Sequence, residues 1–310
     1  MALKFRKKIL LAKIETTYGT DASPTGGANA ILTKELDISP MEGDAVNRNV
    51  DRPTLGNDLS IHVGTHVMVT FKVEMAGAGA VDTAPAYGPL LRACARAETI
   101  NAATNVEYAL VSGNEEAVTM YVHLDGQLHA IVGCRGDVGV SLDTKGIPYY
   151  NFSFTGLWVD PAATADPVPD FTAFQVPNAV TNDNTPTFTL FGNIFNLLAI
   201  NLNQANDVVY RNVVGEESVQ ITDRKPAGNI TIEAPPLGTF NAFTTARANT
   251  TGSLQLVHGT VAGNIVQHDL PYVQLLNPKY GESDAIRTLQ MDLAFIPSSA
   301  GDDEWLITTK

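Results

Sequence analysis

Charged residues are scarce in this 310-residue chain, at 17% against about 25% in an average globular protein. Hydrophobic residues make up 44% of the sequence, so the chain is too apolar to be disordered. Because so little charge is available to cover the surface, we expect part of it to be buried against other copies of the chain, as interface cores are depleted in charge. The scarcity of charge is a first indication of self-assembly.

Cysteines and long apolar runs are also scarce. The two cysteines, Cys94 and Cys134, lie in dissimilar contexts without the spacing of a zinc or redox pair, so we expect isolated buried thiols. No window approaches the roughly 18 consecutive apolar residues of a membrane span, and the apolar run at residues 9–12 is shorter than the roughly 7–15 residues of a secretory signal core. We therefore expect no membrane partner, and a chain that stays in the cytoplasm of the cell that makes it.

Basic residues are outnumbered by acidic ones. The sequence has 20 Lys and Arg against 33 Asp and Glu, a formal net charge of −13. Proteins that bind nucleic acid over a broad surface do so by neutralising phosphates with Lys and Arg. The charge balance therefore argues against such binding.

Alternation of polar and apolar residues with a period of two dominates the sequence. Residues 66–75 place every second residue, from Val67 to Met75, on one apolar face, which is typical of a half-buried strand. Asp125 and Gly126 separate two further runs, 118–124 and 127–134, and suit the positive φ angles of a two-residue hairpin turn. Helical spacing occurs at residues 88–98 and 239–249. The sequence predicts a mostly β protein with one short helix in each half.

The expected elements occur twice in the same order. The first series has strands at 31–38 and 66–75, a helix, the hairpin and a strand at 149–157. The second series has strands at 196–202 and 229–234, a helix, strands at 253–257 and 264–270, and a strand at 287–296. This order predicts an internal duplication into two β domains, residues 1–160 and 188–310. Residues 161–187, rich in Pro, Asp, Thr and Asn, are expected to be a linker over the surface.

The longest irregular stretch of the first half is residues 40–64. A loop of this length is uncommon inside a compact domain unless it has a function. It mixes charges of both signs with few apolar anchors, so we interpret it as an arm that becomes ordered on a neighbouring subunit; a plain mobile loop is the alternative. The residues expected at that contact are Asp44, Arg48, Val50, Asp51, Arg52, Leu55 and Asp58.

Catalytic and metal-binding patterns are weak. His62 and His66 flank the start of a predicted strand, where residues four apart are roughly 13 Å distant. His123 and His129 flank the hairpin turn without a third ligand at suitable spacing. The sequence also has no G-x-S-x-G nucleophile motif. We expect no enzyme activity, no metal and no cofactor.

Two further clusters are given structural interpretations. Gly133, Gly136 and Gly139 follow a hairpin strand and precede no helix, so bulges are favoured over a phosphate-binding loop. The acidic run at residues 302–304 lacks the glycine and spacing of a calcium loop. We expect it to be a solvated acidic tail.

The amino-terminal residues resemble those of one family. Residues 12–24 read AKIETTYGTDASP and residues 28–31 read ANAI, leading into the first strand. Together with the order strand, long loop, strand, helix and hairpin, this resembles the major tail tube proteins of long-tailed, non-contractile (siphovirus-type) bacteriophages. The order of elements covers nearly the whole chain. Length is the departure, because a single tube domain would need about half of it.

The resemblance implies tandem tail-tube-type β-sandwich or β-barrel domains, each with one short flanking α-helix. Subunits of that family form rings with a continuous inner β-barrel, and the rings stack into a tube through which double-stranded DNA is ejected without specific binding. An acidic lumen would repel the phosphates. The implied partners are other copies of the chain and the tape measure, terminator and distal tail proteins. The implied location is the virion tail, assembled in the bacterial host cytoplasm.

Ring symmetry and function each have an alternative. A duplicated chain implies trimeric rings with pseudo-sixfold symmetry, whereas a decorated second domain would give an ordinary sixfold ring. A β-sandwich module for host recognition or carbohydrate binding would need clusters of exposed Trp and Tyr, and Trp158 and Trp305 do not supply them. A β-rich enzyme is a further class, which the weak catalytic patterns disfavour.

Overall fold

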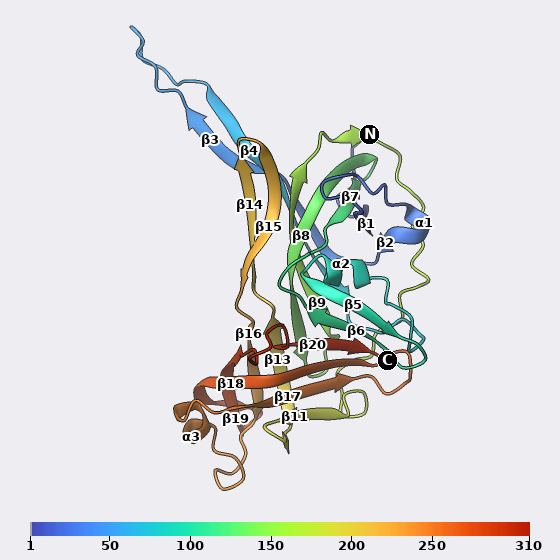
Figure 1. Ribbon diagram of the computed structural model, residues 1–310, viewed down its shortest axis with the longest axis vertical. Helices are drawn as coiled ribbons and strands as arrows, with labels where there is room; N and C mark the ends of the chain where they lie inside the picture. Colours follow the sequence, from blue (N-terminus) through green and yellow to red (C-terminus); the bar gives the residue numbers. More distant parts are fainter. Residues whose placement is uncertain (1) are drawn as a thin grey trace.

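The computed structural model describes residues 2–310 and consists mainly of antiparallel strands (Figure 1). The elements of the first half are β1 (Lys8–Ile14), α1 (Gly26–Asn29), β2 (Ala30–Ile31), β3 (Lys34–Asn47), β4 (Ser60–Glu74), α2 (Gly88–Arg92), β5 (Arg96–Asn101), β6 (Asn105–Leu110), β7 (Val118–Leu124), β8 (Gln127–Asp143), β9 (Tyr149–Trp158) and β10 (Ala162–Ala163). The mostly β class and the short helices expected from the sequence are confirmed.

The second half of the described chain also has ten strands. Its elements are β11 (Thr187–Leu190), β12 (Asn193–Ile194), β13 (Leu197–Asn203), β14 (Asn206–Val213), β15 (Glu216–Arg224), β16 (Ala227–Glu233), α3 (Ala242–Arg247), β17 (Thr251–His258), β18 (Val266–Ser283), β19 (Ile286–Phe295) and β20 (Leu306–Thr309). In residues 2–310, no helix combines the length and apolarity needed to cross a membrane.

One antiparallel sheet passes through both halves. Its strands pair in the order β3-β4-β9-β8-β13-β16-β19-β18, and we call it the shared sheet. The pairing of β8 with β13 joins the first half to the second. The two halves are therefore parts of one continuous sheet.

The alternation seen in the sequence explains how the shared sheet packs. Phe71 of β4 lies opposite Phe152 of β9, and their ring centroids are 5.5 Å apart. Both rings are 2% exposed, whereas Thr70 and Lys72 on the other face are exposed or half-buried. Burying one such apolar side chain contributes roughly 1.5–3 kcal/mol relative to leaving it in water.

The strands of the two halves follow the same order in space. In the first half neighbouring strands run β2-β1-β7-β8-β9-β4-β3. In the second half they run β12-β11-β17-β18-β19-β16-β13. Along the chain, α2 follows β4 and α3 follows β16. The seven strands of each row therefore occupy corresponding positions in the two halves.

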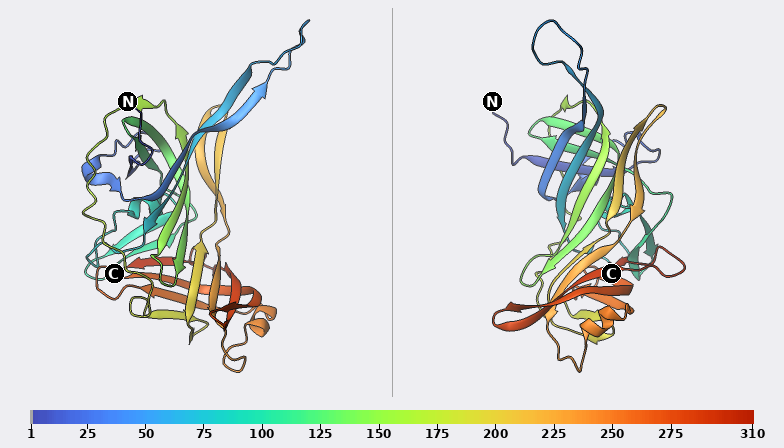
Figure 2. Two further views of the ribbon diagram at one scale, coloured as in Figure 1. Left: turned by 180° about the vertical axis from the view of Figure 1, so that it is seen from behind. Right: turned by 90° about the vertical axis from the view of Figure 1, so that its left-hand side faces the viewer.

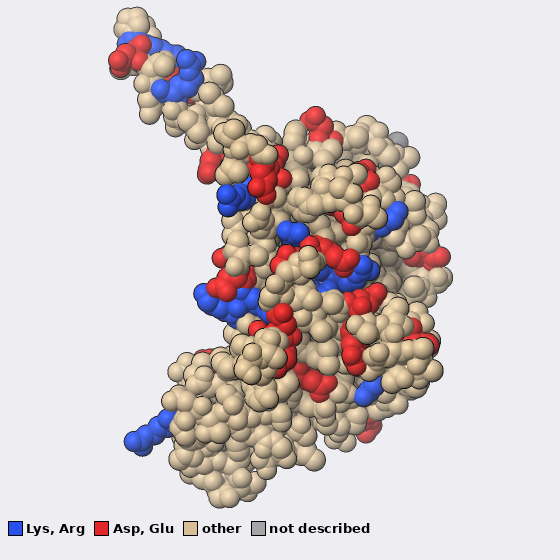
Figure 3. Space-filling model, in the orientation of Figure 1, with Lys and Arg blue, Asp and Glu red and all other residues tan. Residues whose placement is uncertain are grey.

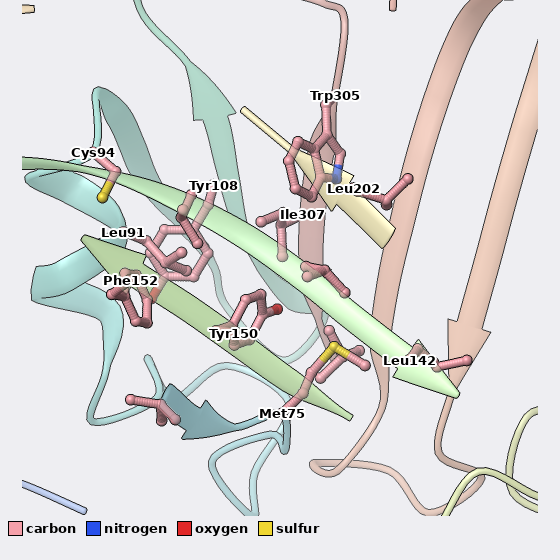
Figure 4. Packing of buried hydrophobic residues seen from close by; sticks show 14 of the residues in the cluster. Met75, Leu91, Cys94, Tyr108, Leu142, Tyr150, Phe152, Leu202, Trp305 and Ile307 are labelled. Atoms are coloured by element: carbon pink, nitrogen blue, oxygen red, sulfur yellow. The ribbon is translucent and has the colours of Figure 1, made fainter. Parts of the chain in front are cut away.

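The C-terminal strand closes a second connection between the halves. β20 pairs with β6 of the first half and with β18 of the second. Trp305, just before β20, is fully buried and packs in one core with residues of both halves (Figure 4). The interior is therefore shared as well as the sheet.

Arg96 ties three distant segments together inside this core. Its guanidinium donates hydrogen bonds to Gln204 Oε1 at 2.8 Å and to the carbonyl oxygens of Tyr108 and Trp305 at 3.0 Å. It also lies over the Trp305 ring, 4.6 Å from the centroid. Burial lowers the pKa of Arg96 to about 9. These bonds fix Gln204, which lies between β13 and β14, against the first half.

The helices are shorter than the sequence predicts. Residues 88–98 were expected to be helical, but α2 ends at Arg92, Ala95 has a φ of 59°, and Arg96 begins a strand. Residues 239–249 contain only the six-residue α3, whose amino-terminal cap is Asn241, with its side chain accepting a hydrogen bond from Thr244 N. In both places a turn ends the helix where the apolar spacing continues.

Burial of His268 makes stability depend on pH. Its Nδ1 accepts a hydrogen bond from Trp305 Nε1 at 3.2 Å, and burial lowers the pKa of His268 to about 3, from 6.5. As the pH falls below 6.5 the unfolded chain binds a proton that the folded chain takes up only near pH 3. Stability that is fully present above pH 6.5 is therefore lost between these values, by up to about 1.4 kcal/mol per pH unit.

We expect His268→Gln to flatten the slope of unfolding free energy against pH between about pH 4 and 6, because glutamine does not titrate. Urea denaturation at a series of pH values measures this slope. His62→Gln, which replaces an exposed histidine outside the core, is the matched control for the substitution itself. An unchanged slope in His268→Gln would show that another group titrates.

Candidate assembly interface

A long hairpin extends from the body of the molecule. β3 and β4 continue past the shared sheet and remain paired from Asp44 opposite Val63 to Asn47 opposite Ser60. The hairpin points away from the rest of the chain in every view (Figure 2). We call residues 40–64 the first arm. The sequence predicted an irregular loop here, which is wrong for most of the segment: residues 48–59 form the irregular tip, and the rest is strand.

The seven residues predicted for a subunit contact all lie on the first arm. Asp44 is on β3, and the others are in the tip. Arg52 pairs with Asp58, and Val50 N donates to Asp58 Oδ2 at 3.1 Å, so part of the predicted charge is used inside the tip. Asp58 is half-buried by these contacts, and the remaining predicted residues are exposed. The structure brings the set together along one hairpin.

Apolar side chains along the first arm are exposed to solvent. They are Met41, Val46, Val50, Leu55, Leu59, Ile61 and Val63, with exposed fractions between 40% and 104%. They are more numerous than the few apolar anchors expected from the sequence. Exposed apolar groups concentrated on one projecting hairpin are typical of a contact surface.

A second hairpin, β14 with β15, was missed by the sequence analysis. We call residues 206–224 the second arm. It lies between β13 and β16 along the chain, just as the first arm lies between the inner parts of β3 and β4. Unlike the first arm, it packs against the chain's own first half. The Tyr210 ring stacks on His66 with centroids 4.5 Å apart, and Val219 N donates to the Tyr18 hydroxyl at 2.5 Å. Alternating Val208, Tyr210, Val219 and Ile221 were the signal available in the sequence.

The shared sheet ends at two strand edges. Within residues 2–310, β3 pairs with β4 alone, and residues 275–283 of β18 pair with β19 alone. Leu276 and Tyr280 on the β18 edge are 37% and 48% exposed. Edge strands carry unsatisfied backbone N–H and C=O groups that can pair with another chain.

The face of the shared sheet that points away from the core is polar. A shallow depression crosses the β8–β13 joint. The polar residues of its lining are Asp137, Asn151, Ser153, Asn201, Asn203 and Asn229, and they lie beside the apolar Val140, Phe152 and Leu202. Along the strands, acidic residues on this face alternate with buried residues that face the core. The acidic residues are Asp37, Glu74, Asp137, Asp143, Glu233 and Asp292. Basic residues there include Lys72 and Lys279. We call this surface the polar face.

Charged groups are unevenly spread over the outer surface. In Figure 3 they gather over the first half and the arms, and the part formed by β17, β18, β19 and α3 shows few. This is the distribution expected if low charge reflects contact surfaces rather than a uniform dilution of charge.

The catalytic candidates remain separate in the structure. In the described residues, no three His, Cys, Asp or Glu side chains are grouped as metal ligands. His66 is stacked on Tyr210. His123 and His129 lie on β7 and β8, and burial lowers the pKa of both. Cys94 and Cys134 are buried free thiols, as predicted.

The glycine and acidic clusters have structural roles. β8 is bulged between Val132 and Arg135, and Gly133 has a φ of 61° with the Tyr18 ring where a Cβ would be, so the prediction of a bulge is confirmed. The prediction of a solvated acidic tail is wrong. Arg224 at the base of the second arm lies 2.7 Å from Asp302 and 3.4 Å from Glu304, and Glu304 is buried.

Comparison with known proteins identifies the family of the chain. A search of curated proteins finds no match to the chain. The family model described as phage tail tube protein matches residues 6–296, which is nearly the whole chain and includes both arms and the shared sheet. The resemblance seen in the sequence is thereby confirmed, and the chain belongs to the phage tail tube protein family.

Proposed function

We propose that this protein is the structural subunit of a phage tail tube, which assembles with itself into rings that stack into a hollow conduit for double-stranded DNA. Membership of the tail tube family carries the proposal. The exposed apolar first arm and the two unpaired edges of the shared sheet support it, because they are surfaces that self-assembly would cover. Other tail proteins, namely the tape measure, terminator and distal tail proteins, are the further partners, and the location is the virion tail after assembly in the host cytoplasm.

We further propose that each subunit contributes two tube-type domains that arose by duplication, residues 1–160 and 188–310, joined by the linker 161–187. The matching strand order of the halves supports this division. β4 lies between β3 and β9, and β16 lies between β13 and β19. The linker is anchored by Asp170 N to Gly26 O and by buried Val180. Rings of three such subunits would have pseudo-sixfold symmetry.

The polar face is proposed to line the lumen. Its acidic side chains would repel the phosphates of DNA, and its asparagine and serine side chains would leave the surface hydrated, so the duplex could pass without binding. The proposed role is structural and not enzymatic. A carbohydrate-binding function is disfavoured because Trp305 is fully buried and cannot stack on a sugar ring.

We expect the purified protein to form rings and tubes at high concentration, because the sheet edges and the first arm are covered only on assembly. Sedimentation together with negative-stain electron microscopy measures this. A strictly monomeric species that makes no tubes even with the other tail proteins present would contradict the proposed function.

Deleting residues 47–57 should leave the subunit folded and prevent tube formation. The deletion removes the tip of the first arm, and Val46 and Ile61 remain paired beyond the core strands. Ordering the tip costs on the order of 10–20 kcal/mol in backbone entropy, so its contacts in the tube must be extensive. Circular dichroism checks folding and electron microscopy checks tubes.

The matched control for this deletion replaces the same residues with an equally long Gly-Ser segment. It preserves loop length and removes Leu55 and the tip charges, so it should also fail to form tubes. Normal tubes from either variant would show that the tip of the first arm is only a mobile loop.

Reversing charge on the polar face should make tubes retain DNA. Glu233→Lys with Asp292→Lys places two cations per subunit on the proposed lumen wall, where they can neutralise phosphates. Retention of short duplex DNA by the variant tubes, measured by co-sedimentation, should be higher than for wild type. This extra retention should decrease when salt is added. Asp166→Lys with Asp170→Lys changes net charge equally in the linker and should retain no more DNA than wild type; equal retention by both variants would contradict the assignment of the lumen.

A further inference from the structure

The joint between the two halves is a complete strand-to-strand interface inside one chain. Residues 139–143 of β8 pair antiparallel with residues 199–203 of β13, with Val140 opposite Leu202. Both side chains are buried, at 1% and 2% exposed. Gln204 N donates to Val138 O at 3.0 Å and Thr144 N to Leu198 O at 2.9 Å, which continues the ladder at each end.

Tyr280 holds in the second half the place that Val140 holds in the first. Val140 lies opposite Tyr150 of β9, and Tyr280 lies opposite Leu289 of β19. The next residues across the sheet are Val73 of β4 and Ile232 of β16. The C-terminal part of β18 is therefore the counterpart of the part of β8 that makes the internal joint.

Ile38 likewise holds in the first half the place that Leu202 holds in the second. Ile38 lies opposite Val69, and Leu202 lies opposite Gly228. Val69 lies four residues before Val73, and Gly228 lies four residues before Ile232, so both pairs keep the same alignment. The counterpart of the jointed part of β13 is therefore residues 37–39 of β3.

These two counterparts are the unpaired edges of the shared sheet. Tyr280 is 48% exposed where Val140 is 1% exposed, and Ile38 is half-buried where Leu202 is 2% exposed. The two edges lie at opposite ends of the strand row, so one chain cannot pair them with each other without closing on itself. A second copy of the chain would supply the missing edge for each.

Charge favours the same partner. On the polar face, Lys279 lies one residue before Tyr280, and Asp37 lies one residue before Ile38. In the register of the internal joint these two side chains would be diagonal neighbours across the new pair of strands, within reach of each other. The internal joint has Gly139 and Asn201 at these places, so the opposite charges occur only at the open edges.

We propose that neighbouring subunits join by pairing β3 of one copy with β18 of the next, antiparallel, with Ser39 opposite Lys279, Ile38 opposite Tyr280 and Asp37 opposite Gly281. The register is that of the internal β8–β13 joint carried to the open edges. This inference rests on the proposed self-assembly and names the surfaces that carry it. The contact is head-to-tail, so in a ring whose rotation closes it returns to the first subunit and leaves no open edge.

Cysteine pairs test this register. Ser39→Cys and Lys279→Cys chains, mixed and oxidised under conditions where tubes form, should give a disulfide-linked dimer, because directly opposed Cβ atoms lie about 4.5–5.5 Å apart and small shifts bring them within bonding range. Each single variant alone should stay unlinked. The native thiols are 0% and 1% exposed and should not interfere.

The matched control shifts the register by two residues on the same face. Asp37→Cys mixed with Lys279→Cys places the Cβ atoms about 7–8 Å apart and should link at least about tenfold more slowly. Linking of Ser39→Cys with itself would indicate symmetric pairing of two β3 edges and overturn the proposal. Tubes in the same samples without the Ser39–Lys279 link would also overturn it and leave the proposed function intact, whereas wild-type protein that forms no assemblies would count against the proposed function itself.

Charge exchange gives a second readout that does not depend on oxidation. Asp37→Lys and Lys279→Asp should each raise the concentration needed for ring assembly roughly twofold to fivefold for each joint affected, and the double exchange should restore it. Electron microscopy across a dilution series measures this concentration. Losses that simply add in the double variant would contradict the proposed neighbours.

Discussion

Backbone hydrogen bonding at strand edges is the constraint on which this structure depends. Each strand of the shared sheet presents N–H and C=O groups on both sides, and these need partners. Inside the chain the constraint is met by β13 beside β8 and by β20 between β6 and β18. Arg96 holds the first of these arrangements in place through Gln204, at the point where β13 leads into the second arm. Within the shared sheet, the strand edges left without a partner are those at the two ends of the row.

Much of the fold could be predicted from local patterns. Period-two alternation gave the strand containing Phe71, and Asp125 and Gly126 gave the β7–β8 hairpin, with φ angles of 46° and 90° at these residues. Both signals act over a few residues, so neighbouring sequence is sufficient to read them. The family resemblance also came from a short amino-terminal stretch and the order of elements, and the family match extends to residue 296.

The features that sequence reasoning missed depend on distant partners or on backbone geometry. Asp302 and Glu304 were predicted to lie in a solvated tail because their partner, Arg224, is about 80 residues away in the sequence. α2 ends early because Ala95 adopts a left-handed backbone conformation. This conformation is uncommon for residues other than glycine, so an alanine in the sequence does not indicate it. The first arm was predicted to be a loop because bulges interrupt the pairing of β3 with β4, and these bulges break the alternation of polar and apolar residues. The first miss reflects a contact with a distant residue, and the other two reflect backbone geometry that residue patterns do not reveal.

The internal β8–β13 joint has a consequence for the kinetics of assembly. Because both strands belong to one chain, this joint forms without the loss of translational freedom that separate molecules incur on association, a loss of several kcal/mol. In the proposed trimeric ring, half of the domain-to-domain contacts would already exist in each monomer. Ring formation would then rise with about the third power of subunit concentration instead of the sixth, which would favour assembly while the subunit is still dilute.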